Sequence, residues 1–311
     1  MQVLDRPKPR RIQVAVPLLL LIVALTWWQP YAVIEGIQRA GLYAAIALPM
    51  ALILGIVGIV NLAHGDFLMV GAYLAYWLVV GTRIDPLVAA APTAVGLFLL
   101  GTITYRVTIK HVIGKPELNQ LLLTFGIAIV LQQSATLLWT SQPVSMSPDY
   151  ASTSISIGSL TFGTYGFIYV AAAVIEFVGL VYFLRSTRLG QAATASGQNP
   201  VGARIVGINV DRVYLLVFSI SLALTGALGV FYLTRHAIFP LMGGLFSLKS
   251  FCLAAMAGLG NLTGILWCSL ILGLAEGLVS SSMEYAGWAD LIFFVAIVAV
   301  ILAQSHQRRV T

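Results

Sequence analysis

The sequence predicts an all-α, polytopic integral membrane protein with about ten transmembrane helices, within a range of eight to ten. Two observations lead to this fold class. Of the 311 residues, 59% are hydrophobic and only 9% are charged, whereas soluble domains contain about 25% charged residues. The apolar residues also gather in runs close to the roughly 20 residues that a helix needs to cross a bilayer. The solvent of this fold is therefore expected to be lipid.

Ten apolar stretches are candidate spans, and the eighth of them is short and interrupted by glycine. They cover residues 12–29, 40–60, 64–81, 86–105, 118–139, 166–184, 213–234, 248–260, 264–282 and 288–304. They predict a single transmembrane domain over 12–304, between an N-terminal tail, 1–11, and a C-terminal tail, 305–311. Residues 248–263 are left open between a full span and a re-entrant segment.

The basic residues predict that both tails are cytoplasmic. In that topology the cytoplasmic segments are 1–11, 61–63, 106–117, 185–212, 261–263 and 305–311. They contain 13 of the 17 Lys and Arg residues, as the positive-inside rule requires. The four on the other side are Arg39, Arg83, Arg235 and Lys249. The net charge of +6 is thus explained by orientation in a lipid bilayer, and no nucleic-acid partner is expected.

The first apolar run follows a cluster of basic residues and resembles a secretory signal. No small-residue cleavage site follows it, and Trp27, Trp28 and Tyr31 are typical of a membrane interface. This pattern predicts an uncleaved first membrane helix.

A polar stretch lies where the second predicted span ends and the third begins. Asn61, His64 and Asp66 lie there among glycines at 55, 58, 65 and 71. An unsatisfied backbone group costs several kcal/mol in hydrocarbon, so such a turn is stable only inside protein or beside a water-filled path. Two interpretations remain: a plain hairpin turn, or a broken helix that lines a transport path.

In the second interpretation Asn61, His64, Gly65 and Asp66 are the candidate site residues. Gly65 supplies backbone freedom to the turn, and His64 bonds a backbone carbonyl that the turn sets free. The polar side chains hold the break or touch the solute. A weak internal echo accompanies this stretch, since Gly58–Leu62 resembles Gly258–Leu262, but it is too short to define a repeat.

Two connectors are long. Residues 140–165 are rich in Ser, Thr and Gly and are expected outside, as a turn or a short β-hairpin. Residues 185–212 are expected inside, with one helix over the small residues 191–196 and a second that starts at Asn199-Pro200 and ends near Gly207. Small residues let a partner's groove approach closely, although an ordinary amphipathic connector would look the same. The candidate partner contacts are Arg188, Gly190, Ala195, Asn199, Arg204 and Gly207.

The chain lacks the motifs of common catalytic sites, so no enzymatic activity is expected. It contains no G-x-x-x-x-G-K-[ST], no H-E-x-x-H and no G-x-S-x-G. Cys252 and Cys268 have no metal-ligand spacing, and no catalytic residue, cofactor or metal is predicted. Glu176 and Glu276 each stand in an apolar run, as helix-packing hydrogen bonders or as members of a proton relay. The sequence thus predicts a path without an energy source of its own, which favours a subunit driven by a partner.

Three stretches together resemble the branched-chain amino acid permease family of ATP-binding-cassette (ABC) importers, which also includes urea and amide permeases. They are Gly58–Tyr73, Leu123–Gln132 and Thr187–Asn209, and the similarity extends over residues 36–304. The resemblance implies a multi-pass subunit of the bacterial inner membrane that pairs with a second permease, related or identical. It also implies two ATPase subunits docked on the coupling loop, 185–212, and a periplasmic binding protein that delivers the solute.

The sequence departs from this family in the coupling loop. A second basic residue and an acidic residue are common there, and this chain has Ala195-Ser196 and Val201-Gly202 in those places. Ion pairs from those positions to an ATPase are therefore not expected.

The predicted function is import of a small polar solute by alternating access, with a branched-chain amino acid as the favoured solute and urea or a short amide as the alternative. A self-contained, ion-coupled transporter that uses His64, Asp66 and Glu276 is the rival from another class. A channel for urea or water is a third reading.

Overall fold

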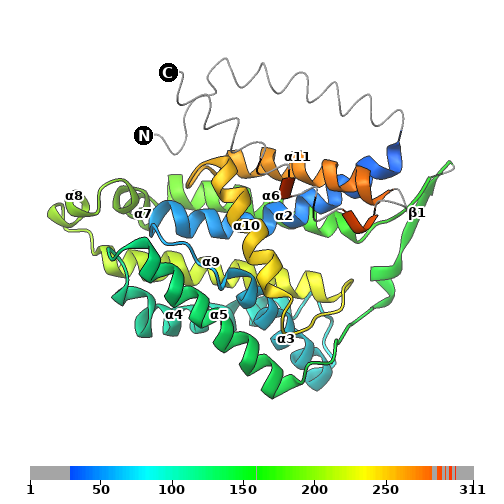
Figure 1. Cartoon of the computed structure of the whole chain (residues 1–311), viewed down its shortest axis with the longest axis horizontal. Helices are drawn as coiled ribbons and strands as arrows, with labels where there is room; N and C mark the ends of the chain where they lie inside the picture. Colours follow the sequence, from blue (N-terminus) through cyan, green and yellow to red (C-terminus); the bar gives the residue numbers. More distant parts are fainter. Residues whose placement is uncertain are drawn as a thin grey trace, which may run out of the picture.

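The computed structural model describes residues 29–158, 160–281 and 286–288, together with single positions 291, 294, 295 and 298. In this part of the chain the fold is helical apart from one β-hairpin (Figure 1). The predicted span 12–29, most of 288–304 and both tails lie outside the described residues.

Most of the described helices lie within a few residues of the predicted spans, but the first of them begins ten residues before the predicted 40–60. Their bounds are α2 Pro30–Ile56, α3 His64–Thr82, α4 Ala90–Val107, α5 Glu117–Trp139, α6 Gly166–Ser186, α7 Arg188–Gln198, α8 Pro200–Ile205, α9 Val210–Leu233, α10 Gly243–Ala257 and α11 Leu262–Ser280. Short 3₁₀ turns cover Ile109–His111, Asp149–Ser152 and Ala286–Trp288. Seven of the described helices are long and apolar enough to cross a membrane, namely α2, α3, α4 with the turn that follows it, α5, α6, α9 and α11. The prediction of an all-α, polytopic membrane protein is confirmed.

Helix α10 is shorter than a bilayer is thick. Its 15 residues extend about 22 Å, against a hydrocarbon core of about 30 Å. Of the two forms left open for 248–263, this length favours a partial span over a full one, and the helix begins and ends several residues before the predicted 248–260.

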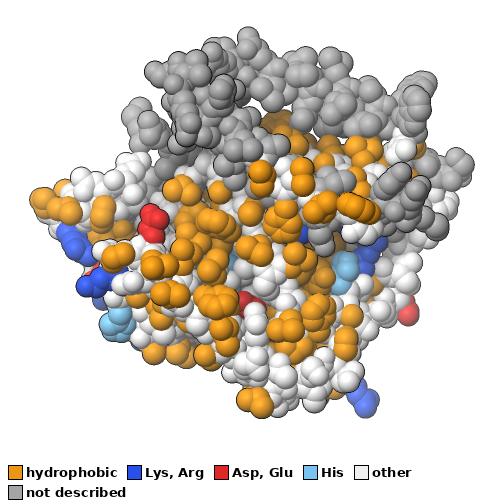
Figure 2. Space-filling model, in the orientation of Figure 1, with side chains coloured by type: hydrophobic (Ala, Val, Ile, Leu, Met, Phe, Trp, Pro, Cys, Tyr) orange, Lys and Arg blue, Asp and Glu red, His pale blue; other side chains and the backbone are white. Residues whose placement is uncertain are grey.

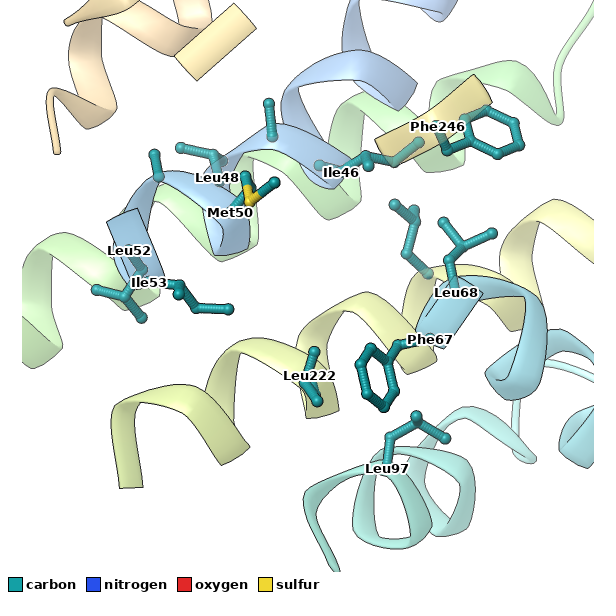
Figure 3. Close-up of a cluster of buried hydrophobic side chains, with 14 of the residues drawn as sticks. Ile46, Leu48, Met50, Leu52, Ile53, Phe67, Leu68, Leu97, Leu222 and Phe246 are labelled. Atoms are coloured by element: carbon teal, nitrogen blue, oxygen red, sulfur yellow. The ribbon is translucent and has the colours of Figure 1, made fainter. Parts of the chain in front are cut away.

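Helix α2 lies at the centre of the described fold, between α6, α9, α10 and α11. Small residues allow this, because a Cβ added to Gly41 would lie 2.6 Å from a backbone atom of Val170, and one on Gly36 would lie 2.8 Å from the Cα of Leu274. Close backbone approach at small residues is the usual way in which membrane helices associate. On the side facing α3, α4 and α9, apolar side chains fill the space, among them Met50, Ile53, Phe67, Leu97 and Leu222 (Figure 3).

The connection from α2 to α3 runs back into the protein. Helix α2 ends at Ile56, yet His64 bonds the carbonyl of Ile46, which lies about ten residues, or about 15 Å, before that end. Asn61 and Ala63 are buried in this connection. The prediction that 61–63 is a cytoplasmic turn is therefore wrong, and a broken helix describes the stretch better than a plain hairpin.

A β-hairpin and the two short helices mark opposite ends of the molecule (Figure 1). Strand β1, Ser154–Ile157, pairs antiparallel with β2, Leu160–Gly163, so of the two forms predicted for 140–165 the short hairpin is the one found. At the other end, α7 and α8 form the long connector that was predicted as cytoplasmic.

The outward faces of α4, α5 and α6 are apolar, as expected for helices surrounded by lipid. Figure 2 shows hydrophobic side chains over much of the face on which α5 lies. Leu99, Leu122 and Ile175 are 56%, 61% and 71% exposed. Two of the four basic residues assigned to the outer side, however, lie inside helices: Arg39 in α2 and Lys249 in α10. They were counted with the outer-side charges that set orientation, whereas in the structure both form ion pairs with the buried Glu276.

Candidate functional site

The N-termini of α3 and α10 meet in the middle of the fold. The backbone N–H of Gly65 donates to Ser247 Oγ over 2.8 Å, and a Cβ on Gly65 would lie 2.7 Å from the backbone nitrogen of Ser247. A Cβ on Gly243 would lie 2.7 Å from the Cα of Asp66. The two helices thus touch through glycines, and neither position has room for a side chain.

This contact corrects the role expected for Gly65. The residue is helical and has no positive φ, whereas Gly58 in the connection has φ +73°. The left-handed backbone that favours glycine is therefore at Gly58, and Gly65 is needed because α10 lies against it.

His64 ties the start of α3 to α2. Its Nε2 lies 2.9 Å from the carbonyl oxygen of Ile46 and 3.3 Å from Thr225 Oγ1 on α9. Because a carbonyl only accepts, Nε2 carries the proton. The expected bond from His64 to a backbone carbonyl is confirmed, but the carbonyl belongs to α2, in the turn before Pro49, where a proline ring disturbs helix geometry.

Asp66 places a carboxylate between the two helix N-termini. Its Oδ1 accepts a hydrogen bond of 2.9 Å from Gln132 Nε2 on α5. It lies in the first turn of α3 and beside Gly243, the first residue of α10, close to the positive ends of both helix dipoles. Asn61, His64 and Asp66 are 1%, 0% and 0% exposed. In this conformation their hydrogen bonds join the start of α3 to the neighbouring helices α2 and α5 and to the connection before it.

The coupling loop has the two helices that the sequence predicts. Thr187 Oγ1 caps α7 by accepting from the N–H of Gly190, and Asn199 Oδ1 caps α8 by accepting from the N–H of Gly202, each over 2.9 Å. Pro200 is the first residue of α8, and Gly207 ends the segment with φ +86°.

The small residues of α7 divide between an inner and an outer face. Ala193 and Ser196 are fully buried, and a Cβ on Gly190 would collide with the backbone of Phe183 in α6, so these three allow α7 to pack closely on the protein's own helices. Ala195 is half-buried and Gly197 is exposed, and a partner contact at these two stays a prediction.

The exposed part of the segment is α8 and its end, which we call the α8 tip: Val201, Ile205 and Val206, at 65%, 81% and 75% exposure. Arg188 and Arg204 are exposed nearby, and Arg204 lies 3.6 Å from Asp211, with both side chains open to solvent. Such an exposed ion pair contributes little, so Arg204 can change partners at small cost.

A charged pocket that sequence reasoning missed lies under the hairpin. It measures about 230 Å³ and is lined by Glu35, Gln38, Arg39, Leu42, Tyr43, Gly166, Tyr169, Tyr232, Arg235, His236, Leu245, Phe246 and Lys249. Gln38 joins it to the hairpin, because its Nε2 donates to the carbonyl of Gly163 over 2.8 Å. Burial and the neighbouring Arg235 lower the pKa of His236 to about 4, so its imidazole is neutral at neutral pH.

Glu276 organises the charges beside this pocket. Its Oε1 accepts from Arg39 Nη1 over 2.7 Å, and its Oε2 accepts from the hydroxyl of Tyr43 and lies 3.5 Å from Lys249 Nζ. Arg39 also bonds Glu35 over 2.8 Å. Of the two roles expected for Glu276, that of a helix-packing hydrogen bonder fits, because the carboxylate joins α11 to α2 and α10 through hydrogen bonds and ion pairs. A sequence signal existed, namely charges at 35, 39, 249 and 276 within or beside apolar runs.

The sequence is similar to permease proteins of branched-chain amino acid transport systems. The permease protein LivH of the high-affinity branched-chain amino acid transport system of Escherichia coli K12 is 29% identical over 287 residues, covering 86% of this chain and 91% of its own. BraD of Pseudomonas aeruginosa is 25% identical, with 86% and 92% covered. LivM of Escherichia coli K12 is 23% identical, with 86% and 68% covered.

A protein-family match covers most of the chain. Residues 32–302 fit the family described as branched-chain amino acid transport system / permease component. This range includes the helix break, the coupling loop and the charged pocket. The chain therefore belongs to the branched-chain amino acid transport permease family.

Proposed function

We propose that this protein is the membrane-spanning permease subunit of an ABC importer for branched-chain amino acids. Membership of the permease family supports this proposal, as do the LivH and BraD relatives, whose names give that transport system. In this proposal a second permease subunit pairs with the chain, two ATPase subunits bind on the cytoplasmic side, and a periplasmic binding protein docks on the hairpin side. ATP binding and hydrolysis in the partners drive alternating access, and the chain itself has no catalytic role.

The observation that carries the proposal is the α8 tip. Three aliphatic side chains, two in the six-residue helix α8 and one directly after it, are exposed at the end opposite the hairpin (Figure 1). Burying one such side chain fully contributes about 1.5–3 kcal/mol, so leaving three exposed to the cytoplasm indicates a surface that a partner covers. An ATPase that moves the permease needs a contact of this kind, and the neighbouring arginines can bond its carboxylates.

The test is Ile205→Asp in the full complex. We expect the variant to insert normally, because the side chain is exposed, but to lose co-purifying ATPase subunits and solute-stimulated ATP hydrolysis. Ile205→Leu, which keeps an apolar side chain there, is the matched control and should behave as the parent. Ala195→Trp is a second probe of the same loop, with the same expected loss.

Full assembly and stimulation in Ile205→Asp would place the ATPase contact elsewhere. Uptake by the purified chain without ATPase subunits, driven by an ion gradient, would favour the self-contained transporter instead.

A further inference from the structure

The charged pocket under the hairpin contains two ionic groups of opposite sign that the protein leaves partly unsatisfied. Glu35 uses Oε1 to accept from Arg39, and among the described residues its Oε2 has no partner. Arg235 is exposed and forms no ion pair with a described carboxylate. Both residues line the same cavity. A carboxylate oxygen and a guanidinium therefore face one space of about 230 Å³.

The remaining charges are held in place by one another. Glu276 and Lys249 are 3% and 5% exposed, and Glu276 accepts from or pairs with Arg39, Tyr43 and Lys249. Removing several charges from water costs several kcal/mol for each ion unless geometry and hydrogen bonds compensate. This network fixes Arg39, and through it Glu35, so that the free oxygen of Glu35 has a defined position.

Part of the pocket lining is apolar and aromatic. Leu42, Leu245 and Phe246 line it, and Tyr232 stacks on His236 with ring centroids 4.4 Å apart and meets Phe246 edge to face at 5.1 Å. Ligand sites commonly combine an apolar lining with a few placed polar groups, in cavities of about 300–1,000 Å³ for drug-sized molecules. This pocket is smaller, which suits a solute of a few heavy atoms.

We propose that this pocket binds the transported solute as a zwitterion, with Arg235 bonded to the α-carboxylate, Glu35 Oε2 bonded to the α-ammonium, and the aliphatic side chain against Leu42, Leu245 and Phe246. Arg39 and Glu276 act as positioning residues. The inference rests on the proposed function for the amino acid nature of the solute, and it adds where on this chain the solute is recognised. A guanidinium suits a carboxylate because it bonds it in a bidentate manner.

The experiment measures binding of three ligands to the full permease assembly in detergent, by competition against radiolabelled leucine. They are leucine, isopentylamine, which lacks the carboxylate, and 4-methylpentanoate, which lacks the ammonium. Each analogue should bind the parent at least about tenfold more weakly than leucine, because a hydrogen bond to a charged group is lost.

Arg235→Gln should weaken leucine at least about tenfold and leave isopentylamine almost unchanged, since the amine never contacted Arg235. Glu35→Gln should also weaken leucine at least about tenfold. It should leave 4-methylpentanoate almost unchanged, since that ligand has no ammonium to contact Glu35. Arg83→Gln, which changes an exposed arginine in another connector, is the matched control for Arg235→Gln and should bind all three as the parent does.

Equal losses for leucine and its insensitive analogue would mean that the residue acts only through the fold, and would overturn the assignment. Parent-like leucine binding by both variants, or no leucine binding by a parent complex that imports leucine, would overturn it while leaving the proposed function intact. A parent complex that neither imports nor binds any branched-chain amino acid would instead refute the proposed function.

Discussion

The contact between α3 and α10 makes Gly65→Ala the sharpest test of the helix break. An alanine Cβ at this position would lie 2.7 Å from the backbone nitrogen of Ser247 and 2.9 Å from the Cβ of Phe246, and closer still to the carbonyl oxygen of Gly243. Real Cβ atoms essentially never approach other atoms within 3.0 Å. Two of the three obstructing atoms are backbone, so no side-chain rotation relieves the overlap and α10 itself must move.

Overpacking of this kind typically costs about 1–3 kcal/mol. Moving α10 also endangers the hydrogen bond from Gly65 N–H to Ser247 Oγ. We therefore expect Gly65→Ala to lower the thermal unfolding midpoint of the purified permease and to abolish most uptake, and Gly65→Val to do so more severely.

The control is Gly81→Ala, in the same helix, where an added Cβ meets no atom within 4 Å. Alanine is the better helix former by about 1 kcal/mol, so this variant should be as stable as the parent or slightly more stable. A parent-like midpoint together with parent-like uptake in Gly65→Ala would show that α3 and α10 do not approach as closely as described.

Three further predictions concern the helix break and the topology. Ser247→Ala removes the acceptor of the buried Gly65 N–H and should cost about 1–3 kcal/mol, measured as a lower unfolding midpoint, whereas Ser247→Thr should retain most of the parent's stability. His64→Leu should likewise lower the midpoint by removing the hydrogen bond that ties the start of α3 to α2; a parent-like midpoint would show that the bond contributes nothing. With the two native cysteines replaced by serine, Ser156→Cys on the hairpin should react with an impermeant thiol reagent in intact cells, and Val201→Cys only in inside-out vesicles. Labelling of Val201→Cys in intact cells would reverse the topology.

Much of the fold follows from composition and spacing. Apolar runs of sufficient length place the spans, because lipid requires each crossing segment to satisfy its backbone internally. The caps of the coupling loop were also readable, since Thr187, Asn199, Pro200 and Gly207 occupy the positions at which helices start and stop. These are local rules, and a local sequence pattern is sufficient to apply them.

The charged pocket and the depth of the helix break could not be read in this way. Arg39 and Lys249 look like connector residues when counted alone, and only the fold shows that Glu276 neutralises them from a third helix. Gly190 of α7 was likewise assigned to an outside partner, although it serves close packing on α6. In each case the prediction lacked the knowledge of which residues, distant in sequence, are in contact in the fold.

Helix α2 connects the two ends of this molecule directly. Its first turns carry Glu35, Arg39 and Tyr43 into the charged pocket, and its last turn carries Gly55, whose carbonyl oxygen would lie 2.9 Å from a Cβ on Gly197 of α7. The turn before α11 packs on the same Gly55 through Gly260. In the proposed importer, a force applied by a partner at α8 and α7 would therefore act on the end of α2 through direct contacts. From there α2, a helix of 27 residues and about 40 Å, extends to the charged pocket, so it would connect the partner contact with the proposed solute site.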